Sequence, residues 1–146
     1  MGNTSRADTE LAFDVFRAAT ANDENAILSP YSIATALSMV YAGARTSTAE
    51  QMRDVLRLRL PDDRVHPARN ELDHLINTPP YLYEEETSPP FAIQTANSLW
   101  GQADFPFRDS FLEIMAVDYD SGIYAADFVA EPDVARVAIN QWTADA

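Results

Sequence analysis

The sequence has no cysteine, no lysine and only four glycines among its 146 residues. Without cysteine the chain has no disulfide, no thiolate zinc or iron–sulfur site and no cysteine nucleophile. The sequence also lacks the glycine-rich loops that cradle phosphates or dinucleotides, and it has no nucleophile elbow. We therefore expect no enzymatic activity and no catalytic residue.

Positive charge is scarce as well, because all ten basic residues are arginines and they face 23 acidic side chains, for a net charge of −13. Nucleic-acid binding needs clustered lysine and arginine, so this balance predicts no nucleic-acid partner. Such an excess of like charge is self-repelling at low salt and is screened at high salt. The composition favours a protein adapted to a salty medium, and the alternative is an acidic protein that lacks lysine by chance.

Membrane and export signals were sought at two places. The first ten residues, MGNTSRADTE, have neither the basic start nor the apolar core of a secretory signal peptide. Residues 26–44 carry no charge over 19 positions, about the length of a membrane-spanning helix. Pro30 and several hydroxyl side chains lower the hydrophobicity of this run, so we expect a buried core helix and no membrane partner.

Apolar spacing predicts about six helices and a few short strands. The helices are expected to begin after a cap at Asp8 or Thr9, after Ser29, at Ser47, near Asp62, near Phe107 and at Glu131. Capping-box pairs, either Ser47 with Glu50 or Thr48 with Gln51, support the third start. The strands are expected at residues 26–28, 91–100 and 123–128, and the proline-rich residues 77–90 are expected to form a surface loop.

Neither the histidines nor the acidic residues are spaced as metal ligands. His66 and His74 are eight residues apart on one expected helix, so ~12 Å separates them along its axis, too far to share a metal. We expect both on a solvated helix face. Residues 118–122 resemble the opening of a calcium loop, but Gly122 comes one place early and position twelve is Val129 instead of glutamate. We expect no metal and no cofactor.

Five motifs occur in a characteristic order. They are Asn-Ala-Ile-Leu-Ser-Pro-Tyr-Ser-Ile at 25–33 with Ala-Leu-Ser-Met at 36–39 and Gly-Ala at 43–44, then Thr48 with Gln51, Thr-Ala-Asn-Ser-Leu-Trp at 95–100, Tyr124 to Asp127-Phe128, and Ile-Asn-Gln-Trp at 139–142. Together they resemble the N-terminal portion of the serpin (serine protease inhibitor) family over residues 9–146. The resemblance implies an α+β serpin fold with about six helices and a few strands of the central sheet.

The same resemblance implies a function. Serpins mostly inhibit serine proteases: the protease cleaves an exposed loop, and the loop inserts into the central sheet. That loop lies near the C-terminus of the family's longer chains and has no counterpart here, and the last helical pattern is still running at Ala146. We therefore expect residues 1–146 to be a partial serpin domain, a fragment that is itself non-inhibitory. The alternative is a small acidic helical interaction module without inhibitor activity.

Location and site residues also follow from the resemblance. It implies an extracellular protein, whereas the lack of a signal peptide leaves a cytoplasmic location as the alternative. Three residues match the region where the serpin sheet opens: Ser29, Ser32 and Asn140. We expect Ser29 to cap its helix, both serines to be buried and hydrogen-bonded, and Asn140 to lie on a helix surface facing the sheet.

Overall fold

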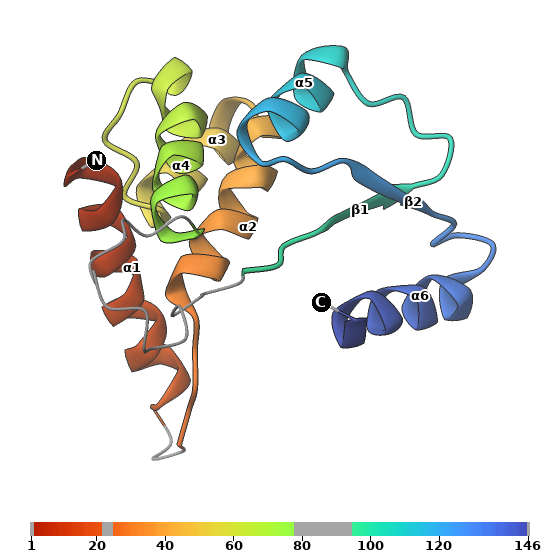
Figure 1. Ribbon diagram of the computed structural model, residues 1–146, viewed down its shortest axis with the longest axis horizontal. Helices are drawn as coiled ribbons and strands as arrows, with labels where there is room; N and C mark the ends of the chain where they lie inside the picture. The colour runs from red at the N-terminus through yellow and green to blue at the C-terminus, as the bar shows by residue number, and fades with distance from the viewer. Residues whose placement is uncertain (1, 22–24, 78–94, 146) are drawn as a thin grey trace, which may run out of the picture. The chain divides into compact units, whose positions relative to one another are not determined.

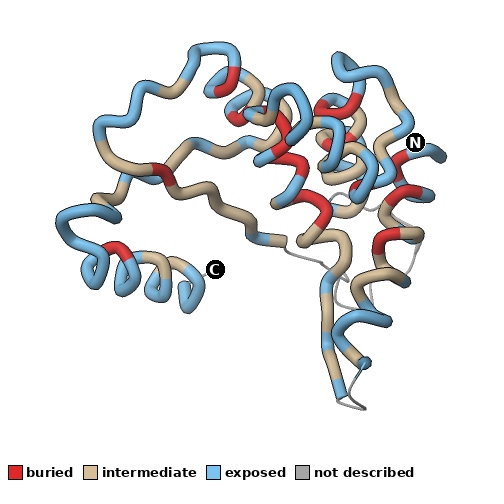
Figure 2. The backbone as a smooth tube through the Cα atoms, turned by 180° about the vertical axis from the view of Figure 1, so that it is seen from behind, coloured by how far each residue is buried: buried red, intermediate tan, exposed pale blue. Residues whose placement is uncertain are grey.

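The computed structural model describes residues 2–21, 25–77 and 95–145. The chain divides into two compact units, Met1–Thr95 and Ala96–Ala146, and each is described by itself. The first unit contains helices α1 (Gly2–Ala19), α2 (Pro30–Gly43), α3 (Thr46–Val55) and α4 (Asp62–Asn77) (Figure 1). Its core is a cluster of apolar side chains from all parts of the unit: Leu11, Ala34, Tyr41, Leu56 and Val65. Figure 2 shows the buried positions along these helices in red.

Helix α1 begins six residues or more before the expected cap. Thr4, Ala7 and Leu11 are its buried residues, and their spacing of three and four places them on one helix face. Asp8 and Thr9 therefore lie within the helix, and the predicted cap was wrong. The helix also turns Phe16 and Ala19 outward, although the apolar pattern predicted both on the inner face.

Helix α2 confirms the bounds predicted for it. Ser29 is its N-cap, Pro30 its first residue and Gly43 its last. The buried face includes Ala34, Ser38 and Met39, whereas Val40 is exposed, so the helix is covered on one side only. The strand predicted at 26–28 was wrong: these residues form no regular element, and Ile27 is fully exposed. A short apolar run forms a strand only where a neighbouring strand pairs with it, and the described residues supply none here.

Helix α3 starts earlier than the capping-box pattern predicted. Arg45 is its N-cap and makes no side-chain capping bond to it. Instead, the Arg45 guanidinium donates hydrogen bonds to the carbonyls of Ala42 and Ala44, at 2.9 and 2.7 Å, and so closes the preceding helix. With a connection this short, α3 begins before Ser47 and Thr48 could cap it. Leu56 is buried as expected, but Val55 is exposed.

The second unit is built on a parallel strand pair. Strand β1 (Leu99–Gln102) pairs with β2 (Ile123–Ala126), with Leu99 opposite Ile123, and helix α5 (Asp109–Asp118) lies in the connection between them. Helix α6 (Pro132–Asp145) follows β2. Both strands are shorter than predicted, because residues 95–98 and 127–128 are not strand; residues 91–94 lie outside the described part. The loop predicted at 77–90 also lies outside it, except for Asn77, which ends α4.

Aromatic side chains hold the second unit together. Trp100 of β1 stacks on Tyr124 of β2 with ring centroids 4.8 Å apart, and Tyr124 also contacts Trp142 of α6 at 6.3 Å. Phe111 and Met115 are the buried residues of α5, as its predicted apolar face required. On α6 the buried residue is Ala135, whereas Val134 and Ala138, predicted on its apolar side, are exposed.

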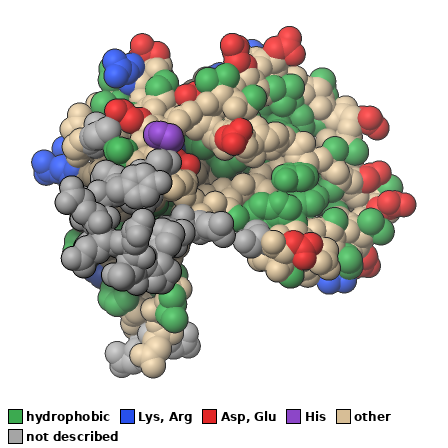
Figure 3. Space-filling model, viewed as in Figure 1, with side chains coloured by type: hydrophobic (Ala, Val, Ile, Leu, Met, Phe, Trp, Pro, Cys, Tyr) green, Lys and Arg blue, Asp and Glu red, His purple; other side chains and the backbone are tan. Residues whose placement is uncertain are grey.

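Two further searches cover the described part of the chain. None of its helices combines the length and the apolar character that crossing a membrane would require. The acidic side chains (red) are scattered over the face drawn in Figure 3 and form no single patch there.

Candidate functional site

The two serines singled out in the sequence meet at the start of α2. The backbone amide of Ser32 donates to the Ser29 side-chain oxygen at 3.3 Å, and the two side-chain oxygens lie 2.8 Å apart. Ser29 therefore caps the helix, as predicted, with Pro30 at the first helical position. A nucleophilic serine needs an adjacent general base. The two hydroxyls instead contact each other and a backbone amide, which is a capping arrangement.

The predicted burial of these serines was wrong for Ser29 and too strong for Ser32. Ser29 is exposed and Ser32 is half-buried. The cause is the segment before the helix, because residues 25–29 are extended but form no strand and cover neither hydroxyl. The hydrogen-bonding half of the expectation is confirmed.

Asn140 was predicted to face the sheet and does not. It is exposed on α6, whereas Trp142 on the same helix contacts Tyr124 of β2. Successive residues of an α-helix turn by ~100°, so Asn140 points ~200° away from Trp142. The structure thus brings Ser29 and Ser32 together and places Asn140 on the solvent face of another element.

A tyrosine beside the two serines was missed from the sequence. The Tyr31 hydroxyl donates to the Asp73 carboxylate at 2.6 Å and joins the start of α2 to α4. Burial, and then the hydrogen bond to Asp73, hold the pKa of Tyr31 well above its usual value of 10. Residues 42 positions apart give no local signal of such a contact; only the position of Tyr31 in the first helical turn, next to the cap, could have suggested it.

The histidine on α4 is not solvated, contrary to the prediction. His66 is 7% exposed and lies between two other buried residues of α4, Val65 and Arg69. Its ring centroid is 6.0 Å from that of Tyr41. Burial lowers the pKa of His66 from 6.5 to about 4, so the imidazole is neutral at pH 7. His74 is exposed, as predicted.

A second set of polar contacts lies beside this histidine. The Tyr41 hydroxyl donates to the Asp62 carboxylate at 2.7 Å, and Arg53 forms an ion pair with the same carboxylate. These hydrogen bonds keep the pKa of Asp62 below its usual value. Arg53 also donates to the carbonyls of Leu58 and Leu60, both at 2.9 Å. The contacts join α2, α3 and α4 around the connection that follows α3.

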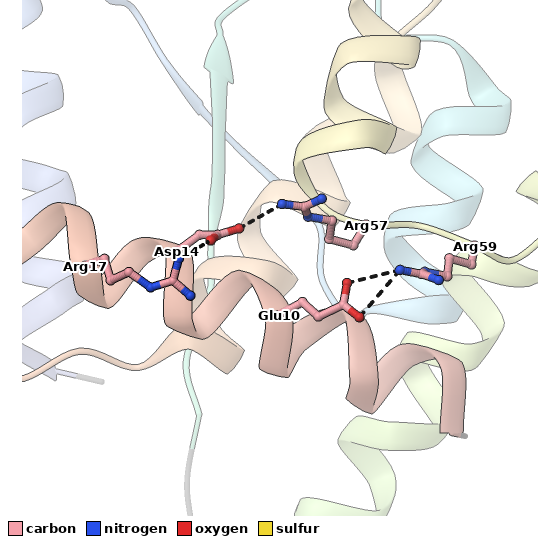
Figure 4. Close-up of polar contacts among 5 residues, drawn as sticks. All are labelled: Glu10, Asp14, Arg17, Arg57 and Arg59. Atoms are coloured by element: carbon pink, nitrogen blue, oxygen red, sulfur yellow. Dashed lines mark hydrogen bonds and ion pairs between the residues drawn. The ribbon is translucent and has the colours of Figure 1, made fainter.

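Ion pairs fasten α1 to the same connection (Figure 4). Arg57 contacts Asp14 at 3.0 Å, and Arg59 contacts Glu10 at 3.1 Å. Arg17 contacts Asp14 from within α1 at 3.4 Å. All of these side chains are partly exposed, so each pair stabilises the fold by ~1 kcal/mol at most.

One ion pair of this unit is buried. Arg69 of α4 donates to both carboxylate oxygens of Asp8 on α1, at 2.6 and 2.9 Å. Their side chains are 3% and 14% exposed. No group of three or more histidine, aspartate or glutamate side chains is placed to hold a metal in the described ranges. The polar contacts of this unit are thus helix-to-helix links that fix the start of α2.

Comparison with known proteins places the chain among inhibitors. The family model described as Serpin (serine protease inhibitor) matches residues 6–146. A leukocyte elastase inhibitor of Xenopus tropicalis is 33% identical over 147 residues, covering 99% of this chain and 37% of the relative. An uncharacterized serpin-like protein of Thermococcus kodakarensis is 33% identical over 136 residues, covering 93% of this chain and 30% of the relative.

Solved structures agree with these sequence matches. Ovalbumin from emu superposes with a TM-score of 0.77 at 27% identity, over 96% of this chain and 38% of that one. A loop-inserted structure of a cleaved ovalbumin mutant gives a TM-score of 0.77 at 26% identity, over 93% and 37%. The α+β fold predicted for the N-terminal portion of the family is confirmed. The chain spans little more than a third of the length of the curated relatives that it matches.

Proposed function

The chain belongs to the serpin family, and we propose that residues 1–146 supply the N-terminal part of a serpin-type inhibitor of a serine protease. The family match over residues 6–146 carries this proposal. The names of the relatives support it, since several are leukocyte elastase inhibitors. Relatives are named as inhibitors or serpin-like proteins, so the chain belongs to a family of inhibitors and not of enzymes.

The proposed mechanism is loop cleavage followed by insertion of the loop into the central sheet. The cleaved ovalbumin mutant, solved with its loop inserted, shows that a structural neighbour accommodates such a strand. Strand addition needs a sheet whose edge offers free backbone groups. The parallel pair β1–β2 supplies two strands toward such a sheet.

In this proposal the start of α2 belongs to the region that parts when the loop inserts. Ser29 and Ser32 would hold that region closed through their mutual hydrogen bond and the helix cap. Ser32→Phe should overpack the half-buried position and favour opening, which mild heating of the longer gene product would reveal as polymers. Ser29→Ala is the matched variant, because it removes the cap, at ~1 kcal/mol, without adding volume.

The inhibitor function is tested with the gene product that carries residues 1–146 and with the 146-residue chain alone. Each is incubated with trypsin-like, chymotrypsin-like and subtilisin-like proteases and then run on denaturing electrophoresis. The longer product should form a complex that survives denaturation with at least one protease, and the 146-residue chain should be digested. No such complex with any protease would contradict the inhibitor function and favour the acidic interaction module.

The proposal places the inhibitor outside the cell, where the resemblance puts its target. Separation of culture medium from cells, followed by immunodetection of the chain, distinguishes this location from a cytoplasmic one.

A further inference from the structure

A small cavity lies in the first unit, where the first turn of α1 meets α4 and the connection that follows α3. Its volume is about 10 Å³, and its lining includes Asn3, Thr4, Arg59 and Arg69. A cavity of this size has room for one atom about as large as a water molecule. Anions such as phosphate or sulfate are too large for it.

Hydrogen-bond donors without partners gather at this cavity. The Arg69 side chain is almost fully buried; its terminal nitrogens contact Asp8, but its Nε has no hydrogen-bond partner among the described residues. The Thr4 hydroxyl oxygen, also buried, likewise has none within that part of the chain. Leaving a buried donor unpaired costs ~1–3 kcal/mol, and more for a charged group.

The backbone adds donors to the same place. Asn3 and Thr4 lie in the first turn of α1, where amide groups have no carbonyl partner within the helix. This turn carries no acidic side chain. The positive end of the helix dipole, equivalent to roughly +0.5 of an elementary charge, therefore faces the cavity without a carboxylate of its own first turn.

The local charge is positive in a protein that is strongly negative overall. Arg59 and Arg69 line the cavity, and their carboxylate partners are Glu10 and Asp8. Glu10 is also shared with Arg6 at 2.9 Å. Three arginines against two carboxylates give this ion-pair group a charge of +1, whereas the chain carries −13.

We propose that the cavity binds one monoatomic anion, chloride in a salty medium, held by Arg69 Nε, the Thr4 hydroxyl and the first-turn amides of α1. A water molecule fits less well, because it has two hydrogens to donate. Arg69 Nε and the amides can only donate, so Thr4 would be the sole acceptor among them. An anion accepts from every one of these donors and balances the local positive charge.

The test is ³⁵Cl nuclear magnetic resonance of the 146-residue chain in NaCl, since chloride exchanging with a protein site gives a broadened line. The wild-type chain should broaden the line, and bromide should reverse the broadening while sulfate at equal ionic strength should not. Thr4→Val should reduce the broadening several-fold. Thr9→Val, on the exposed side of the same helix, should leave it unchanged; the Thr9 hydroxyl donates to the Ser5 carbonyl instead.

A second pair of variants locates the site even if Thr4→Val does not fold, which circular dichroism would reveal. Arg59→Gln removes a lining charge that is half exposed, and should also reduce the broadening several-fold. Arg57→Gln removes a comparable arginine that pairs with Asp14 away from the lining, and should not. Absence of excess broadening in the wild type, or equal broadening in Arg59→Gln and Arg57→Gln, would overturn the proposal and assign the cavity to water.

Discussion

The buried ion pair between Asp8 and Arg69 gives the sharpest test of how the first unit is held together. In Asp8→Ala the guanidinium of Arg69 stays buried, with its side chain 3% exposed, and loses both hydrogen bonds to the carboxylate. Removing one partner of a buried pair costs about 3–5 kcal/mol. With typical urea dependences of 1–3 kcal/mol per molar, the unfolding midpoint should fall by roughly 2 M.

The assay is urea unfolding followed by far-ultraviolet circular dichroism. Arg17→Ala on the same helix is the matched control, because its ion pair with Asp14 is exposed at 73% and 43% and should contribute less than ~0.5 kcal/mol. Asp8→Leu combined with Arg69→Met should recover much of the loss, since a well-packed apolar pair of similar volume leaves no buried charge. If Asp8→Ala shifted the midpoint no more than Arg17→Ala, the assignment of this pair as the link between α1 and α4 would be refuted.

Three other predictions address packing, pH and salt. Gly101→Ala should destabilise the second unit by ~1–3 kcal/mol, because an added Cβ would lie 2.5 Å from the Phe107 ring; Gly122→Ala, with nothing within 4 Å, is the control, and equal thermal midpoints for the two variants would contradict this reasoning. The pKa of His66 is about 4 in the folded chain and 6.5 when unfolded, so the unfolded state takes up a proton first and stability should fall as pH drops from 6.5 toward 4. That slope in denaturation curves should flatten in His66→Gln but not in His74→Gln, and a slope unchanged in His66→Gln would disprove the histidine origin. Raising NaCl from 0.1 to 1 M shortens the screening length from ~10 to ~3 Å, so the helical signal in circular dichroism should rise; a flat or falling signal would remove the interpretation as a halophilic protein.

Local signals predicted the elements that depend on local chemistry. The Ser29-Pro30 start and the Gly43 end of α2 were readable because a cap, a proline and a glycine act within one helical turn. The strand pair and the helix between them were also predicted, because strand and helix periodicities differ. The strand at 26–28 was not predictable in the same way, since a strand needs a partner that local sequence does not name.

The site shows the same division. The hydrogen bond from Ser32 to Ser29 spans three residues and follows from capping, whereas the Tyr31–Asp73 and Asp8–Arg69 contacts join residues 42 and 61 positions apart. The burial of His66 depended on which face of α4 packs inward. Val65, His66 and Arg69 form that face, and an arginine on it contradicts any expectation based on hydrophobicity alone. Only its buried carboxylate partner explains it.

The inhibitor function is tested most directly by the intact mass of the product formed between a serine protease and the gene product that carries residues 1–146. Loop cleavage that stops at the acyl-enzyme predicts one covalent species, with the mass of the protease plus the inhibitor minus the peptide released at the cleaved loop. Separate masses of unmodified protease and of cleaved or intact chain, for every protease tried, would contradict the account.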